Sequence, residues 1–584
     1  MIPLTSEQKA SVLCNENVFI SACPGSGKTR VIVAKLLRLT DRMDNTPRSV
    51  ACITYTNAAV DEISSRVKKL GSNAMLEACE IATIHSFCLR YILRPYSWLV
   101  PDVPSQFTIL TRDSDKFEDL VRAVEGEAGR QVQYRAYEDY ASLRLTTNGD
   151  PQGPGITGGV VSDQTARRFW ELMRLQGYID YALILYYSYL ILRDHQYVSR
   201  GISSKFSWLL VDEFQDTTDI QTKILSFLHK QLNSQFFLVG DENQSISAFA
   251  GARPDLARQF AEIVDAREGV AINGNFRCGQ HIVDAAEQLI PRVPSMYPTG
   301  DAVNSEGEIF AISSDTSGAI EQQFLQLLER DNIPFGETAI LAPWWRHLIP
   351  IAKALRKKGI RVVGPGARPY RRNRLFAALA EQLGACVDED SLDYVISVER
   401  AIYGLINNAM GLDRLDVFSY QGRCTALKLV YATTEISRNG VPAKDWLMQS
   451  ADVCGELLLA DEWIDTSTAE LLSASAIEML NDITKEKIDV DELDLKDLGI
   501  FANPSRAIKL LTLHNSKGRE FEAVAIINAN EGKLPDFRAK TSSEIEEAKR
   551  LFYVGITRAK KHVVIVTDPS DRNGSSRFIQ MAGL

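Results

Sequence analysis

Residues 22–29, with the sequence ACPGSGKT, combine a glycine-rich loop with a lysine and a threonine. Gly25 and Gly27 would let the backbone turn so that its N–H groups point inward at phosphate oxygens. The Lys28 ammonium would reach the outer phosphates, and the Thr29 hydroxyl would hold magnesium. We therefore expect an ATP-binding loop made of Ala22, Cys23, Pro24, Gly25, Ser26, Gly27, Lys28 and Thr29. A glycine-rich turn without a ligand is the alternative.

A second pair with catalytic chemistry is Asp212 and Glu213, which follows the apolar residues 208–211 (WLLV). Ligands of open α/β sheets bind at the carboxyl ends of strands, where this pair would lie. Asp212 would hold magnesium through water, and Glu213 would activate the attacking water. A solvated acidic strand end is the alternative, which the phosphate loop in the same chain disfavours.

The elements that must position these residues are strands followed by helices. Residues 18–21 (VFIS) are typical of a short buried strand, and residues 30–39 (RVIVAKLLRL) of an amphipathic helix. Strand, glycine loop and helix form the order that a P-loop needs. A chain of 584 residues has room for about four folding units of ordinary size.

Eight ordered motifs give the chain a resemblance to the UvrD/Rep type of superfamily 1 DNA helicases. They are LTSEQ (4–8), ITYTNAA (53–59), TIHSF (83–87), DEFQDT (212–217), VGDENQSI (239–246), NFR (275–277), LTLHNSKGREF (511–521) and YVGITRA (553–559). The series covers the family core from end to end but leaves out two long inserts. The resemblance implies an α/β fold with two RecA-like P-loop domains. Each would be a parallel sheet flanked by helices and would carry a mainly helical insertion.

The resemblance also implies roles at the nucleotide. Gln8 would read adenine, Phe276 would stack on the base, and Glu520 would take the ribose hydroxyl. Two arginines would stabilise the phosphate in transfer from a second domain, as guanidinium groups can. The implied catalytic set is Lys28, Asp212, Glu213, Gln244 (the sensor of the terminal phosphate), Arg277 and Arg558, with ATP and Mg²⁺ as cofactors.

A further set would face single-stranded DNA: Thr56, Asn57, His85, Phe249 and His514. The ring of Phe249 would stack on a base, a contact of about 1–3 kcal/mol. Taken alone, His85 fits a core or capping histidine as well as a DNA contact or coupling residue.

The chain departs from the family pattern at several positions. Ala22 stands at the first glycine of the loop, where a small residue still fits. After VGDENQSI, Ser247 stands at an aromatic position and Ala250 at an arginine. We therefore expect a weaker grip on single strands, or weaker coupling of that grip to hydrolysis. The chain also ends soon after residue 559, so we expect the family's common C-terminal interaction tail to be absent.

The motif order predicts the domain layout. The first RecA-like core would take residues 1–88 and 203–275, with a helical insertion at 89–202. The second core would take residues 276–371 and 504–584, with a helical insertion at 372–503.

Residues 179–181 (IDY) resemble an acidic–aromatic step of the family, and a helix N-cap followed by core residues is the alternative.

Composition and charge exclude several classes of protein. With 45% hydrophobic and 24% charged residues, the chain has the material for large cores and is not disordered. No apolar stretch reaches the roughly 18 residues of a membrane span, and the N-terminus lacks a secretory signal. The nine scattered cysteines do not form a disulfide framework, which favours the cytoplasm. A net charge of −10 argues against a wholly basic coat protein.

Two charge runs are open to more than one interpretation. Residues 353–374 hold nine Lys and Arg and no acidic residue, with Tyr370 among them. They could follow a phosphate backbone or form a solvated helix face. Residues 488–498 (IDVDELDLKDL) are acidic and suit a basic protein partner or a plain soluble surface.

The sequence predicts an ATP-dependent translocase or helicase on single-stranded or tailed DNA, moving 3′ to 5′ as the family does. The alternative is a helicase-like sensor of nucleotide and DNA ends that activates a partner nuclease, of the OLD-family type, in prokaryotic antiphage defence. Compact family members of the Gabija type are similar in size. No nuclease motif is visible in the chain, so cleavage would need that partner. A P-loop enzyme acting on something other than nucleic acid is disfavoured by the ordered DNA-facing motifs.

Overall fold

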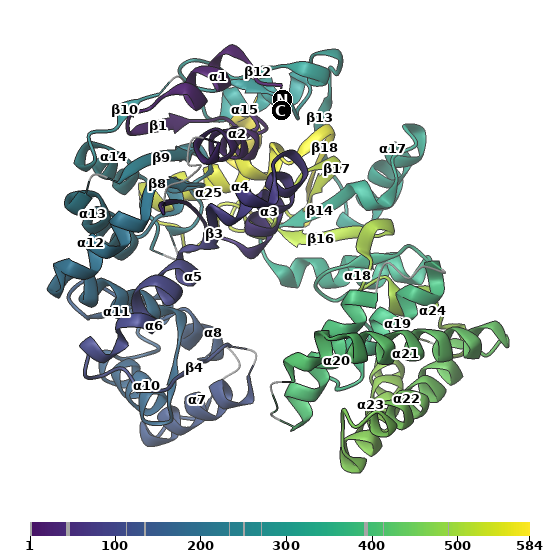
Figure 1. Cartoon of the computed structure of the whole chain (residues 1–584). Coiled ribbons are helices and arrows are strands. Elements are labelled where there is room, and N and C mark those ends of the chain that lie inside the picture. Colours follow the sequence, from purple (N-terminus) through teal and green to yellow (C-terminus); the bar gives the residue numbers. More distant parts are fainter. Residues whose placement is uncertain are drawn as a thin grey trace. The chain divides into compact units, whose positions relative to one another are not determined.

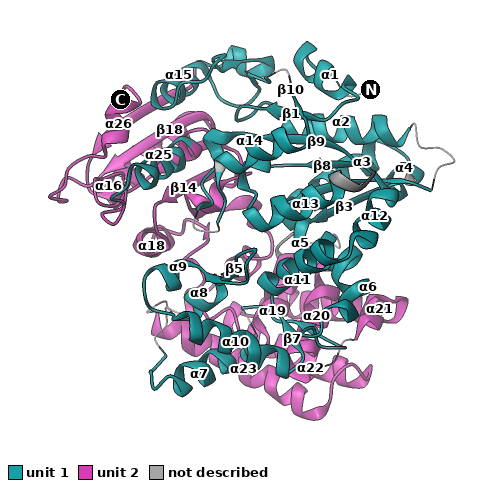
Figure 2. Cartoon of the chain, turned by 90° about the vertical axis from the view of Figure 1, so that its left-hand side faces the viewer, with its two compact units in different colours: residues 1–306, 540–553 teal, residues 307–539, 554–584 magenta. Residues whose placement is uncertain are grey.

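The computed structural model describes residues 3–584 apart from 42–46, 113, 133–135, 233, 249–250, 270, 390–394, 411, 413, 487 and 489. The chain divides into two compact units (Figure 2). Unit 1 comprises residues 1–306 and 540–553, and unit 2 comprises residues 307–539 and 554–584. The second sheet begins only at residue 308, so residues 276–306 belong with the first unit and not with the second core, where we expected them.

Unit 1 contains a six-stranded parallel sheet with the order β10-β1-β9-β8-β2-β3 (Figure 1). Its strands are β1 (Val18–Ser21), β2 (Ser49–Thr54), β3 (Cys79–Thr83), β8 (Phe206–Val211), β9 (Gln235–Gly240) and β10 (Arg267–Glu268). The four inner strands, β1, β9, β8 and β2, are mostly apolar because helices cover both faces of the sheet. Successive side chains of β8 alternate between two cores: Leu210 packs with α2 (Lys28–Thr40), whereas Leu209 packs with α13 (Asp219–Leu232).

The first insertion is mainly helical and shares one core with the α13 face of the sheet. Its main helices are α5 (Ile84–Cys88), α6 (Arg94–Tyr96), α7 (Asp115–Glu127), α8 (Ala136–Ala141), α9 (Pro154–Thr157), α10 (Asp163–Leu175), α11 (Tyr181–Asp194) and α12 (Gln196–Lys205). Short strand pairs join β4 (Thr108–Ile109) to β7 (Tyr178–Ile179), and β5 (Arg144–Leu145) to β6 (Pro151–Gln152). The remaining helices of unit 1 are α1 (Ser6–Leu13), α3 (Asn57–Leu70), α4 (Asn73–Glu77), α14 (Pro254–Ile263) and α15 (Gln280–Leu289), and β11 (Gly274–Asn275) pairs with β12 (Tyr297–Pro298).

Unit 2 repeats the architecture with a second six-stranded parallel sheet, in the order β13-β18-β17-β14-β16-β15. Its strands are β13 (Glu308–Ser313), β14 (Thr338–Ala342), β15 (Val362–Val363), β16 (Ile508–Thr512), β17 (Phe521–Ile526) and β18 (Ala559–Thr567). The helices beside it include α16 (Thr316–Ala319), α17 (Leu325–Arg330), α18 (Leu348–Lys357) and α26 (Arg577–Met581). Helix α25 (Ser542–Ile556) begins in unit 1 and ends in unit 2.

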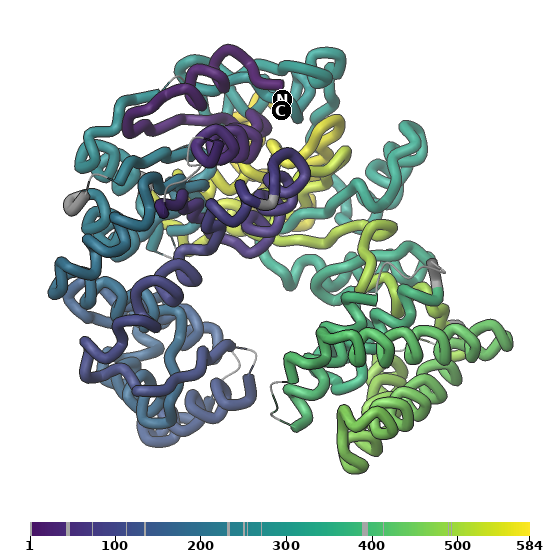
Figure 3. The backbone as a smooth tube through the Cα atoms, in the orientation of Figure 1, coloured from purple at the N-terminus to yellow at the C-terminus, as the bar shows by residue number. Residues whose placement is uncertain are grey.

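The second insertion is a helical bundle with a core of its own, which draws its buried residues from 370–498. Its helices are α19 (Ala377–Glu389), α20 (Val395–Met410), α21 (Tyr420–Arg438), α22 (Ala443–Ala460), α23 (Thr466–Lys485) and α24 (Leu495–Gly499). The green tube of Figure 3 follows the chain back and forth through this bundle. The expected fold class, two RecA-like domains with helical insertions, is confirmed.

Two further expectations concern the chain as a whole. All nine cysteines are free, as their scattered spacing predicted. Across the described residues, every helix is too short or too polar to span a bilayer.

Candidate nucleotide site

The carboxyl edge of the first sheet gathers the P-loop and four of the eight motifs, because all its strands run in parallel. The P-loop follows β1, Asp241 to Gln244 follow β9, and the Asp212–Glu213 pair follows β8. The neighbouring strands β2 and β3 lead to Thr56 and Thr83. One half of this edge therefore carries the residues expected to bind phosphate. The other half carries the motifs that, by the family resemblance, would face DNA.

The P-loop has the backbone that its glycines predicted. Gly25 and Gly27 take φ values of +67° and +79°, which side chains rarely adopt. A Cβ at Gly25 would lie 2.5 Å from Asn275 Oδ1, so no larger residue fits there. The Ser26 hydroxyl is buried and has no hydrogen-bond partner in the described structure. A ligand with phosphate oxygens suits such a cradle, so these residues fit ATP.

Gln8 is tied to the P-loop. Its Nε2 donates to the Ser26 carbonyl at 2.8 Å, and its Oε1 accepts from the Thr5 N–H at 3.0 Å. The side chain is fully buried. Both ends of the amide are therefore occupied by backbone in this structure, whereas the resemblance implied an amide that reads adenine.

The acidic pair occupies a strained turn after β8. Glu213 has φ +49°, an uncommon value for a residue with a side chain, and its N–H donates to Asp212 Oδ1 at 2.9 Å. Burial, with the nearby Glu213 charge, raises the pKa of Asp212 to about 7. A buried carboxylate whose charge is costly suits a cation, so Asp212 and the Thr29 hydroxyl fit a magnesium ion.

A chain of side-chain hydrogen bonds joins the acidic pair to the residues after β9. Gln215 Nε2 donates to Glu213 Oε2 at 2.5 Å, while Gln215 Oε1 accepts from the Asp241 N–H at 2.9 Å. Gln244 Nε2 donates to Asp241 Oδ2 at 2.7 Å. The general-base candidate and the phosphate-sensor candidate are thus held by one network.

Arg292 closes this network and was missed by the sequence analysis. Its Nη1 lies 2.6 Å from Asp241 Oδ1, and the two side chains are only 6% and 1% exposed. Burial opposes the charge on Arg292, but Asp241 outweighs it and holds the arginine pKa above its usual range. Arg292 lies outside every motif, in an irregular segment after α15, and no spacing in the sequence marks it.

Residues 275–277 lie against the P-loop within unit 1. The buried Asn275 side chain accepts from the backbone N–H groups of Arg277 (2.7 Å) and Cys278 (2.9 Å). This fixes the Arg277 Cβ beside Gly25. The Phe276 ring lies 5.2 Å from the Arg30 guanidinium carbon. Arg277 therefore comes from the same unit as the P-loop, and not from a second domain as expected.

The other predicted nucleotide residues belong to unit 2. Arg558 is only 2% exposed, and its guanidinium donates to the carbonyls of Val554 (2.9 Å) and Arg519 (3.3 Å). The Glu520 side chain is 53% exposed and lies 3.8 Å from Lys560 Nζ.

The DNA-facing candidates are placed as follows. Thr56 caps α3, and Asn57 is the first residue of that helix. His85 lies in α5, with its ring 5.3 Å from the Tyr181 ring, and burial lowers its pKa to about 4. His514, in unit 2, also has a pKa lowered to about 4 by burial. Phe249 lies outside the described residues.

The acidic–aromatic step at 179–181 has a structural role. The Asp180 carboxylate accepts from the Leu183 N–H at 2.8 Å, which caps α11, and from the Trp170 indole N–H at 2.8 Å. Asp180 therefore acts as the helix N-cap that the alternative interpretation predicted. Tyr181 is 52% exposed and lies beside His85.

Five of the nine basic residues in the run at 353–374 form ion pairs inside unit 2. Its ion pairs are Lys353–Glu486 (2.6 Å), Lys358–Glu321 (2.6 Å), Arg361–Asp494 (3.7 Å), Arg368–Glu381 (2.7 Å) and Arg374–Asp482 (2.9 Å). Tyr370 is buried. More than half of the run is therefore ion-paired, and both partners of Arg361, Asp494 and Asp497, belong to the acidic run at 488–498.

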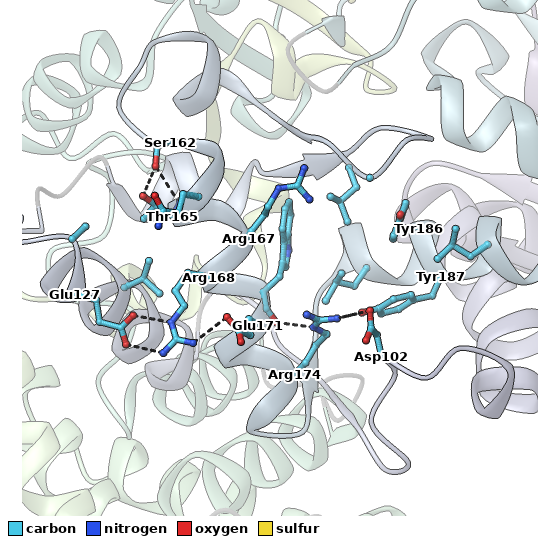
Figure 4. A pocket seen from close by; sticks show the side chains of 18 of the residues that line it. Asp102, Glu127, Ser162, Thr165, Arg167, Arg168, Glu171, Arg174, Tyr186 and Tyr187 are labelled. Atoms are coloured by element: carbon cyan, nitrogen blue, oxygen red, sulfur yellow. Dashed lines mark hydrogen bonds and ion pairs between the residues drawn. The ribbon is translucent and has the colours of Figure 1, made fainter.

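A cavity of about 1180 Å³ lies in the first insertion, and no residue of the P-loop lines it (Figure 4). Arg168 pairs there with Glu127 (2.8 Å) and Glu171 (3.0 Å), and Arg174 pairs with Asp102 (3.1 Å). Because these guanidinium groups are already paired with carboxylates, they would gain little free energy from an anion bound in the cavity.

Comparison with known proteins adds an independent line of evidence. The UvrD/REP helicase N-terminal domain matches residues 4–265, and the UvrD-like helicase C-terminal domain matches residues 458–569. Together the two matches cover well over half of the chain. The ATP-dependent DNA helicase PcrA of Staphylococcus epidermidis is 24% identical, over 99% of this chain and 86% of that protein. A probable DNA helicase II homolog of Mycoplasma pneumoniae (24%, over 97% and 84%) and the ATP-dependent DNA helicase Rep of Buchnera aphidicola (24%, over 96% and 92%) are similar to it as well.

Proposed function

The chain belongs to the UvrD/Rep family of superfamily 1 DNA helicases, and we propose that it is an ATP-driven motor that moves 3′ to 5′ along single-stranded DNA. The observation that carries the proposal is the carboxyl edge of the first sheet. There the P-loop, the Asp212–Glu213 pair and Gln244 lie beside the strand ends that carry Thr56 and Thr83. Because an ATP site and a nucleic-acid surface would share one rigid edge, binding at one can be energetically coupled to binding at the other.

The chemistry of the site follows from these positions. The P-loop N–H groups and Lys28 would bind the phosphates, and Arg277 would stabilise negative charge on the phosphate in transfer. Glu213 would orient the attacking water and accept its proton. Magnesium, held by Asp212 and Thr29, would supply positive charge at the phosphates. We assign Arg558 as the second arginine of this reaction and Glu520 as the ribose contact.

A second candidate is a sensor that acts for a partner nuclease in antiphage defence. What favours it is the departure at Ser247 and Ala250, which removes an aromatic and a cation from the segment after β9. None of the three relatives described above bears the name of such a sensor.

The test is steady-state ATPase activity with and without single-stranded DNA, together with strand displacement on a duplex with a 3′ tail. We expect strong stimulation by the single strand and displacement of the duplex. ATPase activity without displacement would favour the sensor. An ATPase rate that is the same with and without single-stranded DNA would refute the motor. A duplex with a 5′ tail is the matched control for direction.

A further inference from the structure

Arg144 lies on the first insertion and reaches the segment that follows Gln244. It is the first residue of β5, in the β5–β6 hairpin. A Cβ built on Gly251 would lie 2.8 Å from Arg144 Nη1 and 3.1 Å from its Cζ. Gly251 itself has φ +84°, where glycine is favoured. The guanidinium therefore packs directly against the backbone of Gly251.

The charge of Arg144 has no counter-charge in the described structure. Its Nε and Nη1 atoms are buried and make no hydrogen bond to any described residue, and burial lowers its pKa. Its neighbours on the insertion differ. Eight other arginines pair with carboxylates: Arg90, Arg112, Arg122, Arg130, Arg167, Arg168, Arg174 and Arg193. A partly buried guanidinium without a partner is costly, so an anion that binds there gains free energy.

The segment that Arg144 contacts has no cation of its own, because residues 244–252 (QSISAFAGA) contain no Lys or Arg. Its described start is held firmly from α25. Arg550 Nε donates to the Ser245 carbonyl at 2.7 Å, and Glu547 Oε1 accepts from the Ala248 N–H at 3.0 Å. An anion at Arg144 would thus lie beside Gly251, in a segment that begins at the phosphate-sensor candidate Gln244 and is held by α25 at Ser245 and Ala248.

We propose that Arg144 binds a phosphodiester group of single-stranded DNA and supplies the cation that this segment lacks. The phosphates of ATP are already served by the P-loop and Lys28, which leaves the polynucleotide backbone as the anion of this fold. The inference rests on the proposed function, since it names one contact of the same DNA surface.

The experiment measures binding of fluorescent oligothymidylate to Arg144→Ala over a range of salt concentrations. We expect binding to weaken about tenfold or more, as for loss of a hydrogen bond to a charged group. We also expect the slope of log K against log salt to become shallower by about 0.7, the share of one single-strand phosphate. Arg144→Lys keeps the charge and should retain most of the slope. Arg112→Ala, which removes an exposed, paired arginine from the same insertion, is the matched control and should bind like the wild type.

A second arm uses an oligothymidylate with uncharged methylphosphonate linkages. Wild type and Arg144→Ala should bind it equally, because no phosphate charge remains. Wild-type affinity in Arg144→Ala, or weaker binding with an unchanged salt slope, would overturn the inference and leave Arg144 a packing residue. If Arg144→Ala does not fold, Arg144→Lys and Arg144→Gln decide by the same slope. Failure of the wild type to bind oligothymidylate would instead refute the proposed function, so the two failures are distinguishable.

Discussion

The two units hold their nucleotide residues in different ways. In unit 1, side chains hold one another: Glu213, Gln215, Asp241, Gln244 and Arg292 form one connected set of hydrogen bonds and an ion pair. In unit 2, the Arg558 guanidinium donates to backbone carbonyls of its own unit, and Glu520 is mostly exposed. The first set is preorganised, whereas the second can exchange its backbone partners for a ligand.

This difference separates two kinds of effect. Substitutions in the connected set of unit 1 should change stability and turnover together, because each side chain also satisfies a buried neighbour. Substitutions of the unit 2 residues should act mostly on turnover. Glu520 is mostly exposed, and loss of Arg558 leaves two carbonyls without a donor, a cost of about 1–3 kcal/mol that is smaller than the cost of an uncompensated buried charge.

The largest effect is expected for Lys28→Ala. It removes the cation that binds the outer phosphates, so we expect turnover to fall at least about a thousandfold and ATP binding to weaken. Phosphate release and equilibrium binding of a fluorescent ATP analogue measure the two effects. Turnover close to that of the wild type would refute the assignment of the P-loop. Lys9→Ala, an exposed lysine on α1, is the control and should leave both values unchanged.

Arg558→Ala should be nearly as damaging to turnover but not to binding. An arginine that acts on the phosphate in transfer is worth about a thousandfold or more in rate. We therefore expect kcat to fall by that order, with ATP affinity close to the wild type and a loss of stability smaller than that of Arg292→Met, since only two carbonyl hydrogen bonds are lost. The same two assays decide, together with a thermal melt. A fall in stability like that of a core variant would show that Arg558 is structural and would remove the contrast between the units.

The sequence predicted the parts of the site that are local. Gly25, Gly27 and Lys28 are fixed by their spacing, since a P-loop is a short segment whose backbone dictates its residues. The Asp212–Glu213 pair follows from an apolar strand that ends in carboxylates. The two parallel sheets were implied by the family resemblance that the ordered motifs carry.

Contacts between distant segments could not be predicted in this way. Arg292 pairs with Asp241, 51 residues away, and nothing in its neighbourhood marks it as more than a surface arginine. The same holds for Arg144. The assignment of Arg277 to the second core failed because a motif gives a residue's type but not the unit on which its backbone packs. The buried Asn275 amide places residues 275–277 in unit 1, because it holds the chain beside Gly25.

Arg292→Met should lower both stability and turnover. It leaves the Asp241 carboxylate buried without its cation, which costs about 3–5 kcal/mol in comparable pairs. Because Asp241 also holds Gln244, we expect kcat to fall about tenfold or more with a smaller change in KM. Arg292→Lys should recover part of both losses. The double variant Arg292→Met with Asp241→Asn should recover stability but not kcat, since the uncharged Asn no longer needs the arginine. Wild-type kcat in Arg292→Met would show that the ion pair only supports the fold.

The smallest effect concerns His85, on the DNA-facing half of the edge. Burial lowers the pKa of His85 to about 4 from an ordinary 6.5, so folding favours the neutral ring. This contribution to stability is present above pH 6.5 and is lost as the pH falls from 6.5 towards 4. His85→Gln cannot take up that proton, so its loss of stability on acidification should be smaller than that of the wild type, by about 1–2 kcal/mol. Urea unfolding at pH 7.5 and pH 5 measures the difference, and His281→Gln, an exposed histidine on α15, is the control. An identical pH response in His85→Gln and the wild type would place His85 in contact with solvent and free to titrate. The DNA-facing half would then be less rigid than the nucleotide half that adjoins it.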